Sequence, residues 1–131
     1  MERKKILLAE DESSVMCAIV ETLSPYYDVK AVENGKKAVE TAEKNVPDLI
    51  ILDIMMPVMD GITACRVIRS KSSLRKVPVM FLTARGQVTD VENGFNAGAD
   101  SYIIKPFSAA VLLKKIETVF SKVSIREKIK R

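Results

Sequence analysis

The sequence predicts an α/β fold in which helices cover both faces of a parallel sheet. Short apolar runs alternate with amphipathic stretches five times within the first 120 residues. Such continuous apolar runs are typical of strands that are buried on both faces. Because strands and helices alternate, right-handed crossovers between parallel strands are expected. The length of 131 residues suits a single domain of this class.

Three strands and three helices are expected in the first half of the chain. The strands are the apolar runs at residues 6–9, 29–32 and 49–53. The first helix, over about 14–23, has apolar residues at i, i+4 and i+8 and ends before a proline: Val15, Ile19, Leu23 and then Pro25. The second helix follows the turn at Asn34-Gly35 and has three inward positions: Ala38, Val39 and Ala42. The third begins at Asp60-Gly61, with Cys65 and either Val67 or Ile68 inward.

Two strands and two helices are expected in the second half. Residues 78–82 form a strand that ends at Thr83, and residues 102–104 form one that ends at Lys105. Between them, a helix over 90–97 has Val91 and Phe95 one turn apart, and Gly98 suits its C-terminal end. Ser108 is a candidate cap for the last helix, which has four apolar residues on one face: Leu112, Ile116, Val119 and Val123.

Composition and charge disfavour membrane and nucleic-acid functions. No segment approaches the ~20 apolar residues of a membrane span, and the short run 6–9 does not fit a signal peptide, so we expect a cytoplasmic protein. The net charge of +4 belongs to residues 121–131, because residues 1–120 are neutral overall. Apolar residues interrupt this basic tail and no aromatic residue accompanies it, which disfavours nucleic acid as a partner. We expect a domain over 1–120 and a tail that extends the last helix or forms a linker.

The chain has two cysteines, Cys17 and Cys65, and no histidine. Zinc and iron–sulfur sites are therefore not expected, since no C-x-x-C pair or histidine is present. Catalysis by a Ser-His-Asp or Cys-His arrangement within this chain is excluded. We expect both cysteines to be small buried apolar residues of the helices in which they lie.

Asp53 is the only polar side chain between Asp48 and Asp60. An ionised carboxylate in such apolar surroundings costs free energy unless it has partners. Parallel sheets bind ligands at the carboxyl ends of their strands, and Asp53 ends its strand. The residues that follow the other strands should lie at the same edge of the sheet: Glu10, Asp11 and Glu12 after the first, Thr83 after the fourth and Lys105 after the fifth.

The chemistry of these side chains suits phosphoryl transfer. Glu10, Asp11 and Asp53 offer hard oxygen ligands for Mg²⁺ that keeps some of its waters. Lys105 can bind a phosphoryl oxygen, and Thr83 adds a neutral donor. Asp53 is then the nucleophile that forms an acyl phosphate. For Glu12 we prefer a structural role at a helix N-terminus.

Four segments, taken in order, resemble the receiver domain of two-component response regulators, the family that includes the chemotaxis response regulator. The segments are residues 6–12, 47–61, 78–84 and 98–107, and the resemblance extends from residue 4 to about 120. It implies a flavodoxin-like (βα)5 doubly wound sheet with strand order 2-1-3-4-5. In that topology Cys17 and Cys65 lie on opposite sides of the sheet, so no disulfide is expected.

The resemblance also implies roles for individual residues. Asp53 would accept a phosphoryl group from the phosphohistidine of a sensor histidine kinase or phosphotransfer protein. Mg²⁺ would be held by Glu10, Asp11, Asp53 and the backbone carbonyl of Met55. Thr83 and Lys105 would contact the phosphoryl group, Tyr102 would report the state through its rotamer, and a cis peptide before Pro106 would aim Lys105 into the pocket. Met55 and Arg85 would tune the phosphoryl lifetime.

The face formed by the fourth helix, the fifth strand and the fifth helix would change its binding of a downstream effector or output domain. The same face is a candidate for homodimerisation. We expect no enzyme activity beyond self-catalysed phosphoryl transfer and slow autodephosphorylation. The alternative is a Mg²⁺-dependent phosphatase of the haloacid dehalogenase type, which needs a second aspartate two residues after the nucleophile. Met55 occupies that position, so the acyl phosphate should persist.

Overall fold

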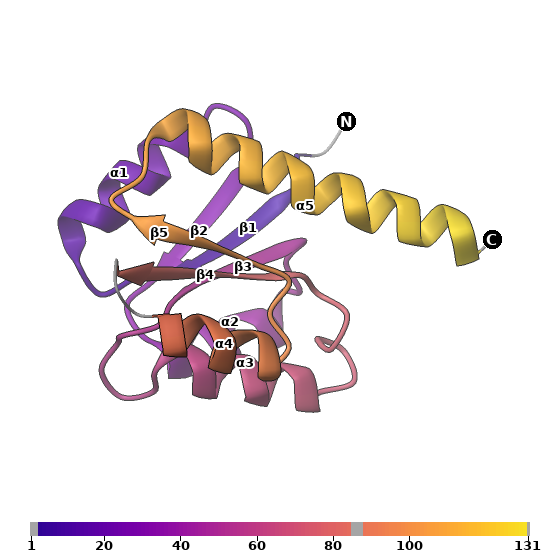
Figure 1. Ribbon diagram of the computed structural model, residues 1–131, viewed down its shortest axis with the longest axis horizontal. Helices are drawn as coiled ribbons and strands as arrows, with labels where there is room; N and C mark the ends of the chain where they lie inside the picture. The colour runs from indigo at the N-terminus through magenta and orange to yellow at the C-terminus, as the bar shows by residue number, and fades with distance from the viewer. Residues whose placement is uncertain (1–2, 85–87, 131) are drawn as a thin grey trace.

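The structure is a computed structural model that describes residues 3–84 and 88–130. Strands and helices alternate along the chain (Figure 1). The strands are β1 (Lys5–Ala9), β2 (Asp28–Val32), β3 (Leu49–Asp53), β4 (Val79–Ala84) and β5 (Ser101–Lys105). The helices are α1 (Ser13–Leu23), α2 (Gly35–Lys44), α3 (Gly61–Ser70), α4 (Val88–Asn96) and α5 (Ala109–Lys130). All neighbouring strands pair in parallel in the order 2-1-3-4-5, which confirms the predicted fold class and topology.

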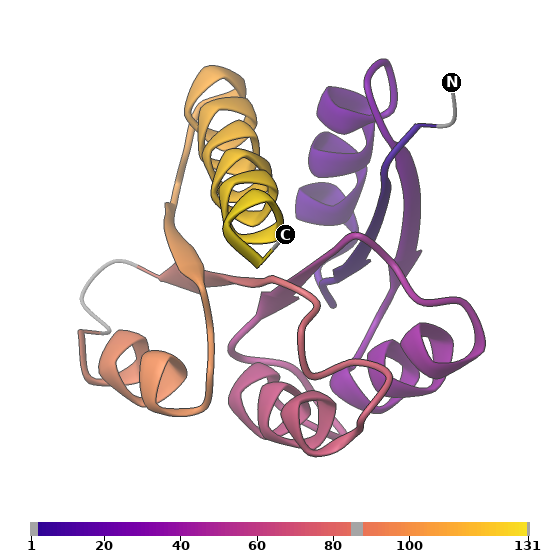
Figure 2. The same cartoon turned by 90° about the vertical axis from the view of Figure 1, so that its right-hand side faces the viewer.

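The sheet separates two hydrophobic cores. Figure 2 shows α1 and α5 on one side of the sheet, with α2, α3 and α4 on the other. The central strand β3 is buried along its whole length. Ile50 and Leu52 pack in the core beneath α2, α3 and α4, whereas Leu49 and Ile51 pack in the core beneath α1 and α5. Because successive side chains of a strand point to opposite faces, burial on both sides requires the continuous apolar run of β3.

Side-chain caps fix the starts of three helices. Asn34 Oδ1 accepts the backbone N–H of Lys37 at 2.8 Å at the start of α2. Asp60 Oδ1 accepts the N–H of Thr63 at 2.7 Å, and Ser108 Oγ accepts that of Val111 at 3.2 Å. These bonds satisfy N–H groups that have no partner within the helix. The bond made by Asp60 fixes the start of α3 directly after the loop that follows Asp53.

Helix α5 continues through Lys130, so residues 121–130 of the basic tail extend the last helix. The helix is anchored at Leu112, Ile116 and Val119, which are buried beneath the sheet. Beyond these residues it projects past the strands (Figure 1). Lys122 and Arg126 on this projection are exposed to solvent. Within residues 3–84 and 88–130, no helix has the length and apolarity needed to cross a membrane.

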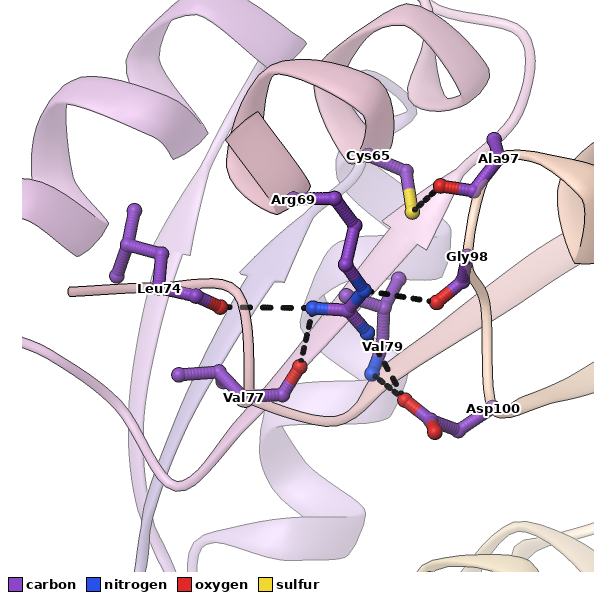
Figure 3. A network of polar contacts seen from close by, with 8 residues as sticks. All are labelled: Cys65, Arg69, Leu74, Val77, Val79, Ala97, Gly98 and Asp100. Atoms are coloured by element: carbon purple, nitrogen blue, oxygen red, sulfur yellow. Dashed lines mark hydrogen bonds and ion pairs between the residues drawn. The ribbon is translucent and has the colours of Figure 1, made fainter. Parts of the chain in front are cut away.

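Arg69 in the last turn of α3 is the centre of a hydrogen-bond network drawn in Figure 3. The network lies at the amino-terminal ends of β4 and β5, whereas Asp53 lies at the carboxyl end of β3. The Arg69 guanidinium donates to the carbonyls of Gly98 at 2.9 Å and Val77 at 2.7 Å, with a longer contact to Leu74 at 3.4 Å. It also pairs with Asp100 at 3.0 Å, whose same carboxylate oxygen accepts the N–H of Val79 at 2.9 Å. One side chain thus joins α3, the start of β4 and the connection from α4 to β5.

Both cysteines are free, and they lie on helices that cover opposite faces of the sheet, as predicted. The expectation that both are buried is wrong for Cys17, which is exposed on α1. Cys17 lies two residues from both Val15 and Ile19, and this spacing places it away from the stripe that packs on the sheet. Cys65 is buried on α3 and its thiol contacts the carbonyl of Ala97 at 3.5 Å. Burial raises the pKa of the Cys65 thiol to about 11.

The two thiols should therefore differ sharply in reactivity. We expect a thiol reagent such as Ellman's reagent to modify Cys17 rapidly at pH 8, because that side chain is accessible. Cys65 should react only as fast as the protein opens around it, because the reactive species is the thiolate and burial disfavours ionisation of this thiol. Stopped-flow absorbance measures both phases. A Cys17→Ser variant should lose the fast phase alone, and a fast phase that survives this substitution would contradict the assignment.

Candidate functional site

Asp53 is the last residue of the central strand β3 and lies between β1 and β4 at the carboxyl edge of the sheet. It is 6% exposed, so its carboxylate needs local partners. One partner is the backbone N–H of Met55, which donates to Asp53 Oδ1 at 3.2 Å. The Met55 side chain points outward and is 62% exposed. The chain after β3 therefore turns back over the carboxylate and leaves a methionine at its rim.

Glu10 and Asp11 follow β1 and reach the same point. A carboxylate oxygen from each of Glu10, Asp11 and Asp53 lies within 4.8 Å of the other two. Glu10 is fully buried, and its Oε2 accepts the N–H of Glu12 at 3.2 Å. Burial, together with a hydrogen bond to Asp53, raises the pKa of the Glu10 carboxyl. Glu12 is exposed and occupies the N-cap position of α1, as expected for a residue at a helix N-terminus, but its side chain makes no capping hydrogen bond.

Lys105, the last residue of β5, bridges the two buried carboxylates. Its Nζ lies 2.7 Å from Glu10 Oε1 and 3.1 Å from Asp53 Oδ2. Burial by itself lowers the pKa of Lys105, but the hydrogen bonds and charges of Glu10 and Asp53 outweigh it and the pKa is raised. Lys105 is therefore a cation in this site, and it compensates charges that would otherwise be costly to bury. The peptide bond between Lys105 and Pro106 is cis.

Thr83 lies on β4, the strand between Asp53 and Lys105. Asp53 is paired in register with Leu82, so Thr83 is one residue further along the neighbouring strand. Its side chain is 1% exposed, and its hydroxyl donates to the carbonyl of Ala84 at 3.4 Å. The predicted residues Glu10, Asp11, Asp53, Thr83 and Lys105 are thus at one edge of the sheet. Arg85, proposed to tune the phosphoryl lifetime, lies outside the described residues.

Gly61 supports the site in a way that the sequence did not reveal. The turn at Asp60-Gly61 predicts a helix start, but the structure also brings the Gly61 backbone against the carbonyl of Asp53. A Cβ at Gly61 would lie 2.2 Å from that oxygen, and the Gly61 N–H donates to Ile54 O at 2.9 Å. Only glycine allows this close approach without moving Asp53. A glycine shortly after a carboxylate-ended strand is the signal that could have indicated it.

Tyr102 on β5 has partners that sequence reasoning also missed. It packs edge-to-face on Phe95 of α4, with ring centroids 5.7 Å apart. Lys115 of α5 contacts both its ring and its backbone carbonyl. Neither contact follows from periodicity, because Phe95 and Lys115 are both exposed or half-exposed positions of their helices. Tyr102 is therefore held between the two helices that flank β5.

Chemically, the arrangement brings together a buried carboxylate that could act as a nucleophile, carboxylate oxygens that could hold a divalent cation, and an ammonium paired with both buried carboxylates.

Comparison with known proteins identifies the family to which this chain belongs. The family model of the response regulator receiver domain matches residues 6–117. The chain is 40% identical over 122 residues to the "Probable transcriptional regulator ycf27" of Galdieria sulphuraria, covering 92% of this chain and 47% of that protein. It is 41% identical to the "Sensory transduction protein BceR" of Halalkalibacterium halodurans, covering 91% of this chain and 51% of that protein.

The chain thus spans about half the length of these curated relatives. A solved structure is similar over nearly its whole length: the receiver domain of the sensor histidine kinase PA1611 from Pseudomonas aeruginosa. Its TM-score is 0.78 at 37% identity, with 88% of this chain and 96% of that chain covered. That structure is described as having a magnesium ion coordinated in its active site cleft. The family match, the identity to these relatives and the shared fold show that this chain belongs to the receiver domains of two-component response regulators.

Proposed function

We propose that the chain is a phosphoacceptor switch in which Asp53 takes a phosphoryl group from the phosphohistidine of a histidine kinase or phosphotransfer protein. A carboxylate oxygen of Asp53 attacks phosphorus, the phosphorus–nitrogen bond breaks, and the imidazole of the partner leaves with the electron pair. The observation that carries this proposal is the buried Asp53 carboxylate with the Lys105 ammonium 3.1 Å away. A lysine in this position can neutralise the charge on the transferred oxygens.

The donor set at the site fits Mg²⁺. Glu10, Asp11 and Asp53 bring hard oxygen atoms within 4.8 Å of one another, and Asp11 is open to solvent for the remaining waters. The backbone carbonyl of Met55 completes the proposed ligand set. When bound, Mg²⁺ would supply positive charge against the phosphoryl oxygens. Lys105 would exchange its contact with Glu10 for a phosphoryl oxygen.

We further propose that Thr83 and Tyr102 carry the phosphorylation state to the face formed by α4, β5 and α5. Phosphorylation adds charge and acceptor oxygens next to Thr83, and it shifts an existing equilibrium only as far as its contacts differ between the two states. Each element of this face exposes a large apolar residue, namely Phe95, Ile104 and Val111. These side chains suit a protein partner, either an effector or output domain or a second copy of the chain.

The acyl phosphate is expected to be a signal and not a step in rapid turnover. A phosphatase of the haloacid dehalogenase type uses a second aspartate two residues after the nucleophile. Met55 occupies this position, and its exposed thioether can neither donate nor accept a proton. Slow loss of the phosphoryl group, shaped by Met55 and Arg85 at the rim, is therefore proposed.

Titration with beryllium fluoride and Mg²⁺, or reaction with acetyl phosphate, tests this function. The wild type should show Mg²⁺-dependent binding or a Mg²⁺-dependent mass increase, and Asp53→Asn should show neither. Backbone amide NMR should locate changes at the strand ends and on the α4, β5 and α5 face. Absence of modification in the wild type would remove the central claim. Amide shifts of that face that do not change with beryllium fluoride would sink the proposed switch.

A further inference from the structure

Lys115 on α5 makes two different contacts with Tyr102. Its Nζ donates to the backbone carbonyl of Tyr102 at 2.8 Å, and the same nitrogen lies 4.7 Å from the centroid of the Tyr102 ring. The ring also meets Phe95 of α4 edge-to-face, with an interplanar angle of 85°. Lys115 is half-buried, whereas its neighbour Lys114 is exposed. The ring is thus held by one residue from each helix that flanks β5.

We infer that Lys115 is a positioning residue that stabilises the present orientation of the Tyr102 ring and thereby opposes the change of state. This inference rests on the proposed function, because it assigns the regulation of the same switch. It concerns a residue outside the phosphoryl and metal site. The proposal is that the basal state of the domain is set partly by a lysine–aromatic contact between α5 and β5.

The two contacts have different consequences. The hydrogen bond reaches a backbone atom of β5, so it holds the ammonium in place whatever the side-chain torsion of Tyr102. The contact with the ring exists only in orientations that keep the ring beside Nζ. A contact made in one orientation and not in another shifts the equilibrium toward the first. Lys115 therefore favours the orientation in which both contacts are present.

Movement of the ring must also break its edge-to-face packing on Phe95. Such aromatic pairs and cation–π contacts are each weak, so phosphorylation can still overcome the preference for the present ring orientation. Loss of the ammonium alone should change the equilibrium between the two orientations of the Tyr102 ring by about two- to fivefold, the effect of one partly exposed cation–π contact. An effect of this size changes the populations of the two states without abolishing either of them.

The test compares Lys115→Met with the matched control Lys114→Met, an exposed lysine one residue earlier on the same helix. Methionine keeps most of the unbranched stem and removes the charge and the donor. Fluorotyrosine NMR, with the Tyr102 signal assigned by a Tyr102→Phe variant, reports the ring without any phosphorylation. We expect Lys115→Met to shift or broaden this signal, Lys114→Met to leave it unchanged, and Lys115→Arg to restore it because arginine retains the cation.

The second readout is the affinity for beryllium fluoride at saturating Mg²⁺. We expect Lys115→Met to bind about two- to fivefold more tightly than the wild type. The gain should vanish when the substitution is made in a Tyr102→Leu background, because no ring is left to hold. A gain that persists there, or an unchanged ring signal in Lys115→Met, would overturn the inference. A wild type that does not bind beryllium fluoride would instead overturn the proposed function and with it the coupling to the switch.

Discussion

Replacing Lys105 with methionine is expected to strengthen Mg²⁺ binding while weakening the binding of beryllium fluoride. The ammonium lies between Glu10 and Asp53, at 2.7 and 3.1 Å from their carboxylate oxygens. It therefore repels a second cation that approaches the same oxygens. Its removal should lower the Mg²⁺ dissociation constant on the order of tenfold, given the strength of charge interactions at such separations. Because the variant should bind one ligand more tightly and the other more weakly, a general loss of structure cannot explain both changes.

The loss of beryllium fluoride affinity should be on the order of tenfold or more, because a charge-assisted hydrogen bond to the phosphoryl mimic is absent. Titration of each ligand by NMR or calorimetry measures both effects. Lys30→Met, at an exposed lysine of β2, is a suitable control for the lost charge. If Mg²⁺ affinity does not rise in Lys105→Met, the ammonium and the metal do not compete for the carboxylates.

The same variant should change the pH dependence of Mg²⁺ binding. Burial and the hydrogen bond to Asp53 raise the pKa of Glu10, while Lys105 lowers it. Without the ammonium the pKa of Glu10 must rise further, and a protonated carboxyl no longer binds the metal. Mg²⁺ affinity should therefore begin to fall at a higher pH in the variant than in the wild type. A fall at the same pH in both proteins would contradict the role given to Lys105.

Replacing Arg69 with methionine should lower the free energy of unfolding by about 2–4 kcal/mol. The guanidinium donates to several backbone carbonyls and pairs with Asp100 (Figure 3). Its removal leaves the Val77 and Gly98 carbonyls without this donor and the Asp100 carboxylate without its cationic partner, in a region where the Arg69 side chain is only 20% exposed. A buried polar group without a partner costs more than the bond itself contributed.

Urea unfolding followed by circular dichroism measures the loss as a lower midpoint with an unchanged slope. Arg66→Met is the matched control, because Arg66 is an exposed arginine one turn earlier on α3. It should stay within about 0.5 kcal/mol of the wild type, as surface substitutions usually do. A similar midpoint for Arg69→Met and Arg66→Met would show that the network in Figure 3 contributes little to stability.

The sequence predicted the fold and the gathering of the site residues because both depend on simple periodicities. Continuous apolar runs identify strands buried on two faces, and parallel strands necessarily bring Asp53, Thr83 and Lys105 to one edge. The contacts at the ends of long side chains could not be predicted. An arginine in the last turn of a helix is already explained by the helix dipole, so the sequence does not indicate that Arg69 binds distant carbonyls.

The same limit applies to the site itself. The sequence placed Lys105 near Asp53 but gave no indication that its ammonium would bridge to Glu10, 95 residues earlier. The close approach of Gly61 to the Asp53 carbonyl depends on the path of a loop, which periodicity does not describe. The exposure of Cys17 could have been predicted, since the spacing of Val15 and Ile19 already places position 17 off the packed side of α1.

The bridge from Glu10 through Lys105 to Asp53 joins the first, third and last strands of the sheet. A fragment that ends before residue 105 lacks Lys105, and an unfolded chain does not hold the three side chains together. Under the proposed function, only the completed fold is able to accept a phosphoryl group. Any ligand of this site must stabilise the folded chain by mass action, so Mg²⁺ together with beryllium fluoride should raise the melting temperature. If Asp53 is the phosphoacceptor, incomplete or misfolded copies of the domain would not be phosphorylated.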